Sequence, residues 1–599
     1  MIKLCEEVAN RKDIDNVKRL KTKTILMILI LLLILTGIVH SGDFISLDEI
    51  EPGMRGRAKT VFAGVEVETF SVEVVDITEN DLGNDLILIN SDDEKINKIG
   101  GIAAGMSGSP VYFDDRLAGA IAYSWSNIED NYALVTPIER MKKLLADIKK
   151  EDLSKKEELD LLKLTTPLLV SGVRGRALDN LKRELSSFDI KRTAGGQAEI
   201  ENIENVTLEP GSAVAVQLVR GDVNIFSIGT LTYIDNNKFA AFGHYFTHKG
   251  PVDFLFSQAY INTIISSPEY PFKLGYPFDR LEGVVNVDRE AGIAGRTDRY
   301  SAIIPLRINI IDQDRNIEEN VFVQMVKDED LLTSLGVNVA LQAVDNTIDR
   351  IGKGTAEITL EALGKELPDL RISRSNIFYS SRDIAARSLI EFQEFLDLLV
   401  FNPFKKVDLV GLNLDIEITS KEKSALIQKA EIINDDIKPG ETMRIKLYLQ
   451  PYRAEVIEKV VEVEIPEDFR PGRASILIES GYNYFDDPIP VTDPEEEETD
   501  MTKAEFEGYT DLESMILDFL EEKKNNEIIL KGTVQRDYRE YEGEDNNNQK
   551  TEEEKIEEFK KVKCTDYVVE GRLNLEIDIN ENNKGNQLER NNNDKNKNP

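Results

Sequence analysis

Apolar and polar residues alternate over short runs in most of the chain, and this period of two predicts a mainly β protein. Between residues 45 and 123, β-rich runs are separated by glycines and Asn-Asp pairs, with no long amphipathic helix among them. One more strand, over 131–138, leads into the first convincing helix, expected over 139–148. A strand followed by a closing helix is a typical end for a β-barrel lobe.

A second β-rich region follows a charged linker and an amphipathic helix expected over 177–188. Consecutive strands are expected over 213–218, 224–233 and 239–243, with more strands up to residue 360 and a helix over 382–399. Beyond Pro403 the alternation becomes strict, as in 443–450, which is typical of an antiparallel, Ig-like sandwich.

These patterns divide the chain into seven segments, which end in an Asn-Lys-Glu tail expected to be disordered. We expect a signal peptide or membrane anchor in 1–41, a β lobe with a serine motif in 42–150, a helical linker in 151–195, a β-rich lobe with a histidine in 196–403, a β-sandwich in 404–493, a small α+β region in 494–580 and the tail in 581–599.

A run from Ile25 to Val39 is apolar at every position except Thr36 and Gly37, and four basic residues precede it. Its fifteen residues span about 22 Å as a helix, short of a hydrocarbon core of about 30 Å but long enough for a secretory signal. We expect export with cleavage near Ser41, and an uncleaved membrane anchor is the alternative. Both place the rest of the chain outside the cytoplasm.

The net charge and the cysteine count limit the partners and cofactors that this chain is expected to bind. The 599 residues carry a formal charge of −37, which argues against a nucleic-acid partner, because phosphate binding requires a basic face. The two cysteines, Cys5 and Cys564, lie at opposite ends of the chain and cannot build a disulfide scaffold or a thiolate metal site. We therefore expect no cofactor and no nucleic-acid partner.

One stretch has the pattern of a nucleophile turn, namely Gly100 to Pro110, in which small residues flank Ser107 on both sides. Such a turn holds a hydroxyl out while its own amides point inward, and the amides of Gly105 and Ser107 are the candidate oxyanion donors. A β-hairpin is expected directly after it. Ser109 is the alternative nucleophile, and an ordinary Gly-Ser loop is the alternative interpretation of the whole stretch.

Histidine, the usual base near neutral pH, occurs three times, and His40 lies in the export segment. His244 and His248 remain, spaced like a zinc-ligand pair on a helix. Gly243 and Gly250 argue against a helix there, and Tyr245 stands where a zinc peptidase has glutamate. No metal site is expected.

Together, Gly100 to Pro110 and Phe242-Gly243-His244 resemble the SpoIVB-type serine peptidase family. The resemblance implies a trypsin-like pair of β-barrels and Ser-His-Asp proteolysis of protein or peptide substrates. By motif, Ser107 matches the nucleophile and His244 the general base, and Asp92 lies at the matching distance before Ser107 for the family's orienting aspartate. Asp253 is the alternative orienting carboxylate. This chain departs from the sporulation members because its serine precedes its histidine, an order that a triad tolerates.

The sequence thus predicts an extracytoplasmic serine endopeptidase. The alternative is a catalytically inactive envelope protein in which the peptidase fold is a scaffold and the sandwich binds a partner. Intact Ser107 and His244 favour catalysis, since a binding module needs neither residue.

Overall fold

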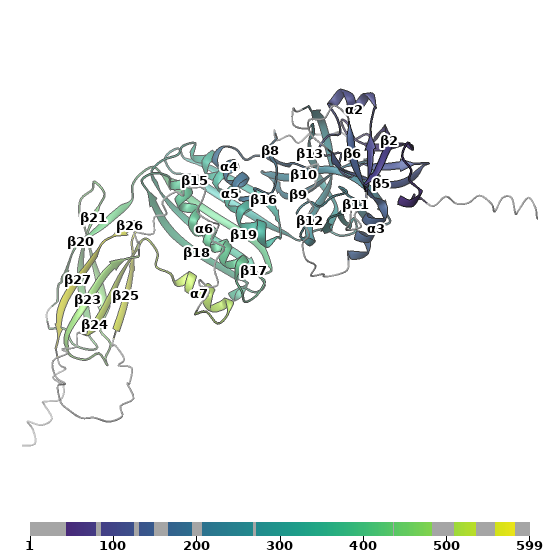
Figure 1. Ribbon diagram of the computed structural model, residues 1–599. Coiled ribbons are helices and arrows are strands. Elements are labelled where there is room, and N and C mark those ends of the chain that lie inside the picture. Colours follow the sequence, from purple (N-terminus) through teal and green to yellow (C-terminus); the bar gives the residue numbers. More distant parts are fainter. Residues whose placement is uncertain are drawn as a thin grey trace, which may run out of the picture.

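The computed structural model describes residues 43–78, 85–124, 131–148, 166–193, 206–266, 271–434, 436–481, 508–534 and 558–580. The expected export segment and the expected C-terminal tail lie outside these ranges. No helix within them combines the length and the apolar character needed to cross a bilayer. The described chain is mainly β, as predicted, and is elongated, with β-barrels at one end and a sandwich at the other (Figure 1).

The first barrel closes with its strands in the order β1-β2-β3-β6-β5-β4. Its apolar residues face inward at every second position, as at Phe70, Val72 and Val74. A short helix, α2 (Glu94–Ile99), is inserted before β4, and α3 (Ile138–Asp147) follows β6 as the closing helix that the sequence predicts. The strands are β1 (Arg55–Thr60), β2 (Glu68–Thr78), β3 (Leu86–Asn90), β4 (Pro110–Phe113), β5 (Arg116–Ser124) and β6 (Tyr132–Pro137).

A second barrel is closed by the pairing of β9 with β10, which completes the ring β9-β12-β13-β14-β11-β10. The expected trypsin-like pair of barrels is therefore confirmed. Its strands are β9 (Ala213–Gly221), β10 (Asn224–Asp235), β11 (Lys238–Ala241), β12 (Gly250–Ile265), β13 (Phe272–Arg289) and β14 (Gly292–Arg296).

The second barrel continues into a large curved sheet, because β9 also pairs with β16 at its far end. The sheet runs on through β15, β19, β17 and β18, while β7 and β8 extend it from β10 on the other side. These strands are β7 (Leu168–Ser171), β8 (Ile190–Arg192), β15 (Ile303–Asp312), β16 (Ile317–Val326), β17 (Gly354–Gly364), β18 (Arg371–Ser380) and β19 (Leu409–Thr419).

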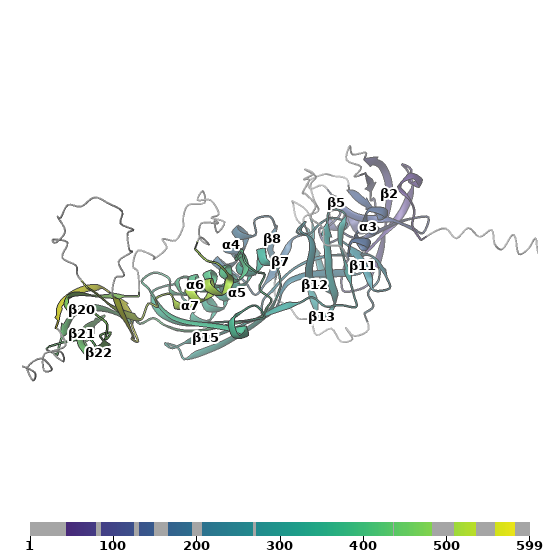
Figure 2. The same cartoon turned by 90° about the horizontal axis from the view of Figure 1, so that it is seen from below.

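Helices α4 (Gly175–Glu184), α5 (Glu329–Ile348) and α6 (Ile384–Phe401) cover one face of this sheet (Figure 2). Their apolar sides and the inward side chains of the sheet form one core that includes Leu335, Val339, Phe392 and Phe395. Strand β19 belongs to this unit, although the sequence boundary was expected at residue 403. It lies parallel to β15 and antiparallel to β17.

Two four-stranded sheets make the sandwich at the other end of the molecule, in the orders β22-β21-β20-β26 and β25-β24-β23-β27. The strict alternation buries Met443, Ile445, Leu447 and Leu449 completely. Strands after residue 526 complete both sheets, so part of the expected α+β region is built into the sandwich. The strands are β20 (Ser424–Ile432), β21 (Thr442–Pro451), β22 (Ile457–Glu464), β23 (Gly472–Ser480), β24 (Glu527–Val534), β25 (Glu558–Cys564), β26 (Val568–Glu570) and β27 (Arg572–Ile579).

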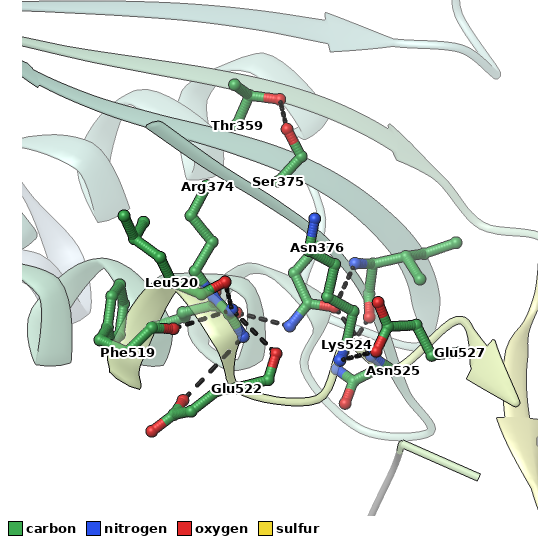
Figure 3. Close-up of polar contacts among 12 residues, drawn as sticks. Thr359, Arg374, Ser375, Asn376, Phe519, Leu520, Glu522, Lys524, Asn525 and Glu527 are labelled. Atoms are coloured by element: carbon green, nitrogen blue, oxygen red, sulfur yellow. Dashed lines mark hydrogen bonds and ion pairs between the residues drawn. The ribbon is translucent and has the colours of Figure 1, made fainter. Parts of the chain in front are cut away.

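Helix α7 (Leu512–Glu521), from the same late region, packs against the helices of the large sheet, with the Phe519 ring 5.8 Å from that of Phe395. Buried Arg374 pairs with Glu391 and donates from Nη1 to the carbonyls of Phe519, Leu520 and Glu522 at 2.9, 3.2 and 3.1 Å (Figure 3). A guanidinium at a helix C-terminus satisfies carbonyls that have no partner within the helix. Arg374 therefore fixes α7 to the middle of the molecule.

Candidate active site

Ser107 lies in a tight turn between α2 and β4, in the first barrel. Gly105 and Gly108 take φ values of 90° and 93°, which disfavour any residue with a side chain. A Cβ at Gly108 would lie 1.9 Å from the carbonyl oxygen of Thr230, so only glycine allows this contact with the second barrel. Ser107 itself is fully buried in the interface.

Within the stretch from Ala104 to Ser109, the amides of Gly105 and Ser107 have no acceptor among the described residues. The amides around them do: Ala104 donates to Pro271, Met106 to Ala103, Gly108 to Ile121 and Ser109 to Met106. Buried amides without a partner are rare in folded proteins and call for an explanation.

The peptide groups that carry these two amides are held from their other side. The carbonyl of Ala104 accepts from the amide of Lys273 at 2.9 Å, and the carbonyl of Met106 accepts from Ser109 at 2.9 Å. Because C=O and N–H point in opposite directions across a trans peptide, the N–H groups of Gly105 and Ser107 are turned away from these contacts. Fixed, unoccupied donors of this kind are what an oxyanion hole requires.

His244 follows β11 in the second barrel, after two residues with positive φ, Phe242 at 70° and Gly243 at 73°. The Phe242 ring occupies the space beside Gly229, where a Cβ would lie 2.3 Å from a ring carbon. Thr136 of β6 donates to the carbonyl of Gly243 at 2.6 Å, so the first barrel also holds this loop. His244 is only 3% exposed.

The structure brings Ser107 and His244 together through one shared neighbour, Thr166. The Thr166 hydroxyl oxygen lies 3.0 Å from Ser107 Oγ and 3.3 Å from His244 Nε2. Nδ1 of His244 lies 2.7 Å from the carbonyl oxygen of Tyr245, which can only accept, so Nδ1 carries the proton and Nε2 faces the Thr166 hydroxyl as an acceptor. The result is a buried chain from hydroxyl to hydroxyl to imidazole.

Neither candidate carboxylate reaches the imidazole in the contacts of the described residues. Asp92 is exposed at the start of α2, where its carbonyl accepts from the Asn97 side chain at 3.2 Å. Asp253 Oδ2 accepts from the amide of Ala302 at 3.1 Å, and burial raises the pKa of this carboxyl. The nitrogen that a triad carboxylate would orient faces the Tyr245 carbonyl instead.

A carboxylate that the sequence did not single out as a site residue, Asp288, fixes the loop after His244. It is fully buried and accepts from the amides of Phe246, Thr247 and His248 at 2.7, 2.5 and 3.0 Å, and from the Thr247 hydroxyl at 2.6 Å. Burial raises the pKa of Asp288, whereas these four donors favour its charged form. No motif in the sequence analysis marks Asp288 as a site residue, because its role depends on contacts with a loop about forty residues earlier in the chain.

The remaining candidates are placed away from this chain of contacts. The hydroxyl of Ser109 is buried with no partner among the described residues, and the contacts to Thr166 come from Ser107 instead. The His248 ring stacks on Tyr245, with 4.2 Å between the ring centroids. Within the described ranges, no group of three side chains is arranged to hold a metal ion.

Comparison with known families gives a match within the first barrel. Residues 45–141 match the family described as SpoIVB peptidase S55, which confirms the resemblance predicted from the sequence. The matched range contains Ser107 and Asp92 and ends before His244. Searches of curated proteins and of solved structures found no significant match to the chain.

Proposed function

Because the barrel that carries Ser107 matches the SpoIVB serine peptidase family, we propose that this protein is a serine endopeptidase that cleaves protein substrates outside the cytoplasm. Ser107 is the nucleophile and His244 the general base in this proposal. The observation that carries it is the buried chain Ser107–Thr166–His244 between two barrels, beside two unoccupied amides of the nucleophile turn.

Serine becomes a useful nucleophile only when a base removes its proton as it attacks. In our proposal the Ser107 hydroxyl passes its proton to Thr166 Oγ1 while the Thr166 proton moves to Nε2 of His244. Ser107 Oγ then bonds to the substrate carbonyl carbon, and its oxyanion is bound by the amides of Gly105 and Ser107. The proton returns from His244 to the leaving amine, and water cleaves the acyl-enzyme by the same route.

The carbonyl of Tyr245 orients the imidazole in this mechanism and stabilises the imidazolium that forms. A carbonyl does this less strongly than a carboxylate, because it carries no full charge. Asp92, the carboxylate expected from the motif, has no part in the proposed relay. Asp288 acts one step further away, by fixing the loop that follows His244.

Labelling with a fluorophosphonate tests the proposal, because this reagent reacts with an activated serine and needs no knowledge of the substrate. We expect the purified full chain to be labelled, and Ser107→Ala and His244→Gln to lose labelling while they remain folded. Ser109→Ala is the matched control and should be labelled like the wild type. Labelling that persists in folded Ser107→Ala would contradict the proposal.

One observation favours a second candidate, a peptidase-fold envelope protein without catalysis. Ser107 is fully buried, and Thr166 lies between it and His244. In that case the barrels are a scaffold and the sandwich binds a partner. Absence of labelling in a folded wild-type chain would favour this function.

A further inference from the structure

A lysine is buried directly behind the nucleophile turn. Lys273, near the start of β13, is 1% exposed, and its Nζ donates to the hydroxyl oxygens of Thr60 and Thr230 at 2.7 and 3.3 Å. No carboxylate pairs with it among the residues that the structure describes. Burying an amine without a counter-ion costs free energy, so a lysine at this position needs a reason other than packing.

Both the backbone and the side chain of Lys273 contact the segment that precedes Ser107. Its amide donates to the carbonyl of Ala104 at 2.9 Å. Its stem packs on Gly105 so closely that a Cβ there would lie 3.1 Å from Lys273 Cβ. The side chain thus packs directly on the turn at Gly105.

Thr230 connects the Lys273 ammonium or amine group to the same turn. The Thr230 hydroxyl, which accepts from Lys273 Nζ, donates to the carbonyl of Gly105 at 3.0 Å. The amide of Thr230 donates to the carbonyl of Ser107 at 2.8 Å. Lys273 therefore fixes the peptide group before Gly105 through its own backbone, and the one after Gly105 through Thr230.

We propose that Lys273 is a positioning residue for the oxyanion hole: it fixes both peptide groups that flank Gly105, the one that carries the Gly105 amide through its own backbone and the following one through Thr230. This inference rests on the proposed serine peptidase function. By accepting from Lys273, the Thr230 hydroxyl is left with its proton directed at Gly105, so the lysine sets the direction of that hydrogen bond.

The protonation state of Lys273 gives this role a measurable signature. Burial alone lowers the pKa of Lys273 to about 7. The groups that face Nζ are Thr60 of β1, Thr230 of β10 and the turn at Gly105, none of which titrates in this range. Below this pH the lysine adds a positive charge behind the oxyanion donors, which strengthens the binding of a developing negative charge.

Four variants of the full chain test the inference by their second-order rate constants for fluorophosphonate labelling. We expect Lys273→Met and Thr230→Val to lower the rate constant about 10- to 100-fold, below the loss typical of a deleted oxyanion donor. Thr60→Val is the matched control, because Thr60 also accepts from Lys273 and has only a long contact of 3.5 Å to the Thr230 hydroxyl, without a hydrogen bond of its own to the turn. It should change the rate constant little. Thr230→Ser, which keeps the hydroxyl, should restore most of the rate.

A pH series separates positioning from packing. The ratio of the wild-type to the Lys273→Met rate constant should rise as the pH falls through about 7, whereas a packing role leaves this ratio constant. If Lys273→Met does not fold, the Thr230→Val and Thr230→Ser pair decides alone.

The inference is overturned by a Lys273→Met rate constant equal to that of the wild type, or by Thr60→Val falling as far as Thr230→Val. Either result would leave the peptidase function intact as long as Ser107→Ala abolishes labelling. A folded wild type without labelling would overturn the proposed function and the inference with it.

Discussion

The hydroxyl of Thr166 lies 3.0 Å from the hydroxyl of Ser107, although the two residues are 59 positions apart and belong to different parts of the fold. The same Thr166 oxygen lies 3.3 Å from His244 Nε2. Thr166 thus occupies the position at which a nucleophile and its base usually meet directly. Its hydroxyl either passes the proton on or blocks the transfer, and the proposed mechanism requires the first.

Substitution of Thr166 should reveal a relay. Thr166→Val keeps the shape but removes the hydroxyl, and we expect the labelling rate to fall about 100-fold or more, the usual range for lost general-base catalysis. Thr166→Ser keeps the hydroxyl and should retain most of the rate. The measurement is the fluorophosphonate rate constant of each variant. A rate increase in Thr166→Val would show that the hydroxyl blocks the serine.

Asp288→Asn should weaken both the fold and the reactivity. The carboxylate accepts four hydrogen bonds, and an amide in its place offers only one acceptor oxygen. Loss of acceptors for buried amides should destabilise the protein by about 1–3 kcal/mol, measured as a lower thermal midpoint, and should slow labelling because His244 is no longer fixed.

Asp253→Asn is the matched control for Asp288→Asn, because Asp253 lies in the same barrel and accepts from the amide of Ala302, away from His244. It should leave labelling almost unchanged. Slower labelling in Asp253→Asn than in Asp288→Asn would assign the orienting role to Asp253.

Lys273 should also impose a pH dependence on stability. Its folded pKa of about 7 lies below its usual value of 10.5, so between these values the unfolded chain binds more protons than the native one. Stability should therefore fall as the pH falls from about 10.5 to about 7, with no further loss from this group below that. The full effect is of the order of 5 kcal/mol at most.

Comparison with Lys273→Met isolates this contribution, because the other titrating groups are common to both chains. The thermal midpoint of Lys273→Met should rise relative to the wild type as the pH is lowered from 10 toward 7. A constant difference between the two midpoints over this range would contradict the lowered pKa.

The role of β19 predicts where the chain can be shortened. A chain that ends at residue 403 lacks β19, which lies between β15 and β17 inside the large sheet. A chain that ends at residue 423 keeps β19 and the hydrogen bond from the Lys423 amide to Thr355 Oγ1. Both chains lack α7, so they differ only in this strand and its flanking residues. We expect the longer chain to fold and be labelled, and the shorter one to unfold at a clearly lower temperature.

The barrels, the helix at the end of the first barrel and the sandwich strands could be predicted because they follow from local periodicity. Buried positions such as Met443 and Ile445 recur at every second residue, so the alternation in the sequence predicts which side chains face the core. Ser107 and His244 could be singled out because small residues surround the first and histidine is scarce. The partners of a strand are not local, however. Alternation over 409–419 fits a sandwich as well as a large sheet, and strands near residues 527 and 572 gave no sign that they complete the sandwich.

The rest of the candidate site depends on contacts between distant segments. Thr166, Lys273 and Asp288 have no distinctive spacing in the sequence. They come close to the site only in the folded chain, where the start of β7 and the two ends of β13 pack near the nucleophile turn and the His244 loop. The choice of Asp92 followed the distance from the serine motif, but the adjacent Asp93 caps α2 by accepting from the amide of Lys95. That cap leaves Asp92 exposed. A spacing along the chain cannot show whether a carboxylate faces the histidine or the solvent.

The most direct test of the central claim is to locate the fluorophosphonate adduct by tandem mass spectrometry. Trypsin cleaves after Lys98 and Arg116, so one peptide carries both Ser107 and Ser109, and fragment ions between them assign the adduct. The proposed mechanism predicts a single adduct on Ser107, lost in folded His244→Gln. An adduct on Ser109, or a folded wild-type chain with no adduct in this peptide, would contradict it.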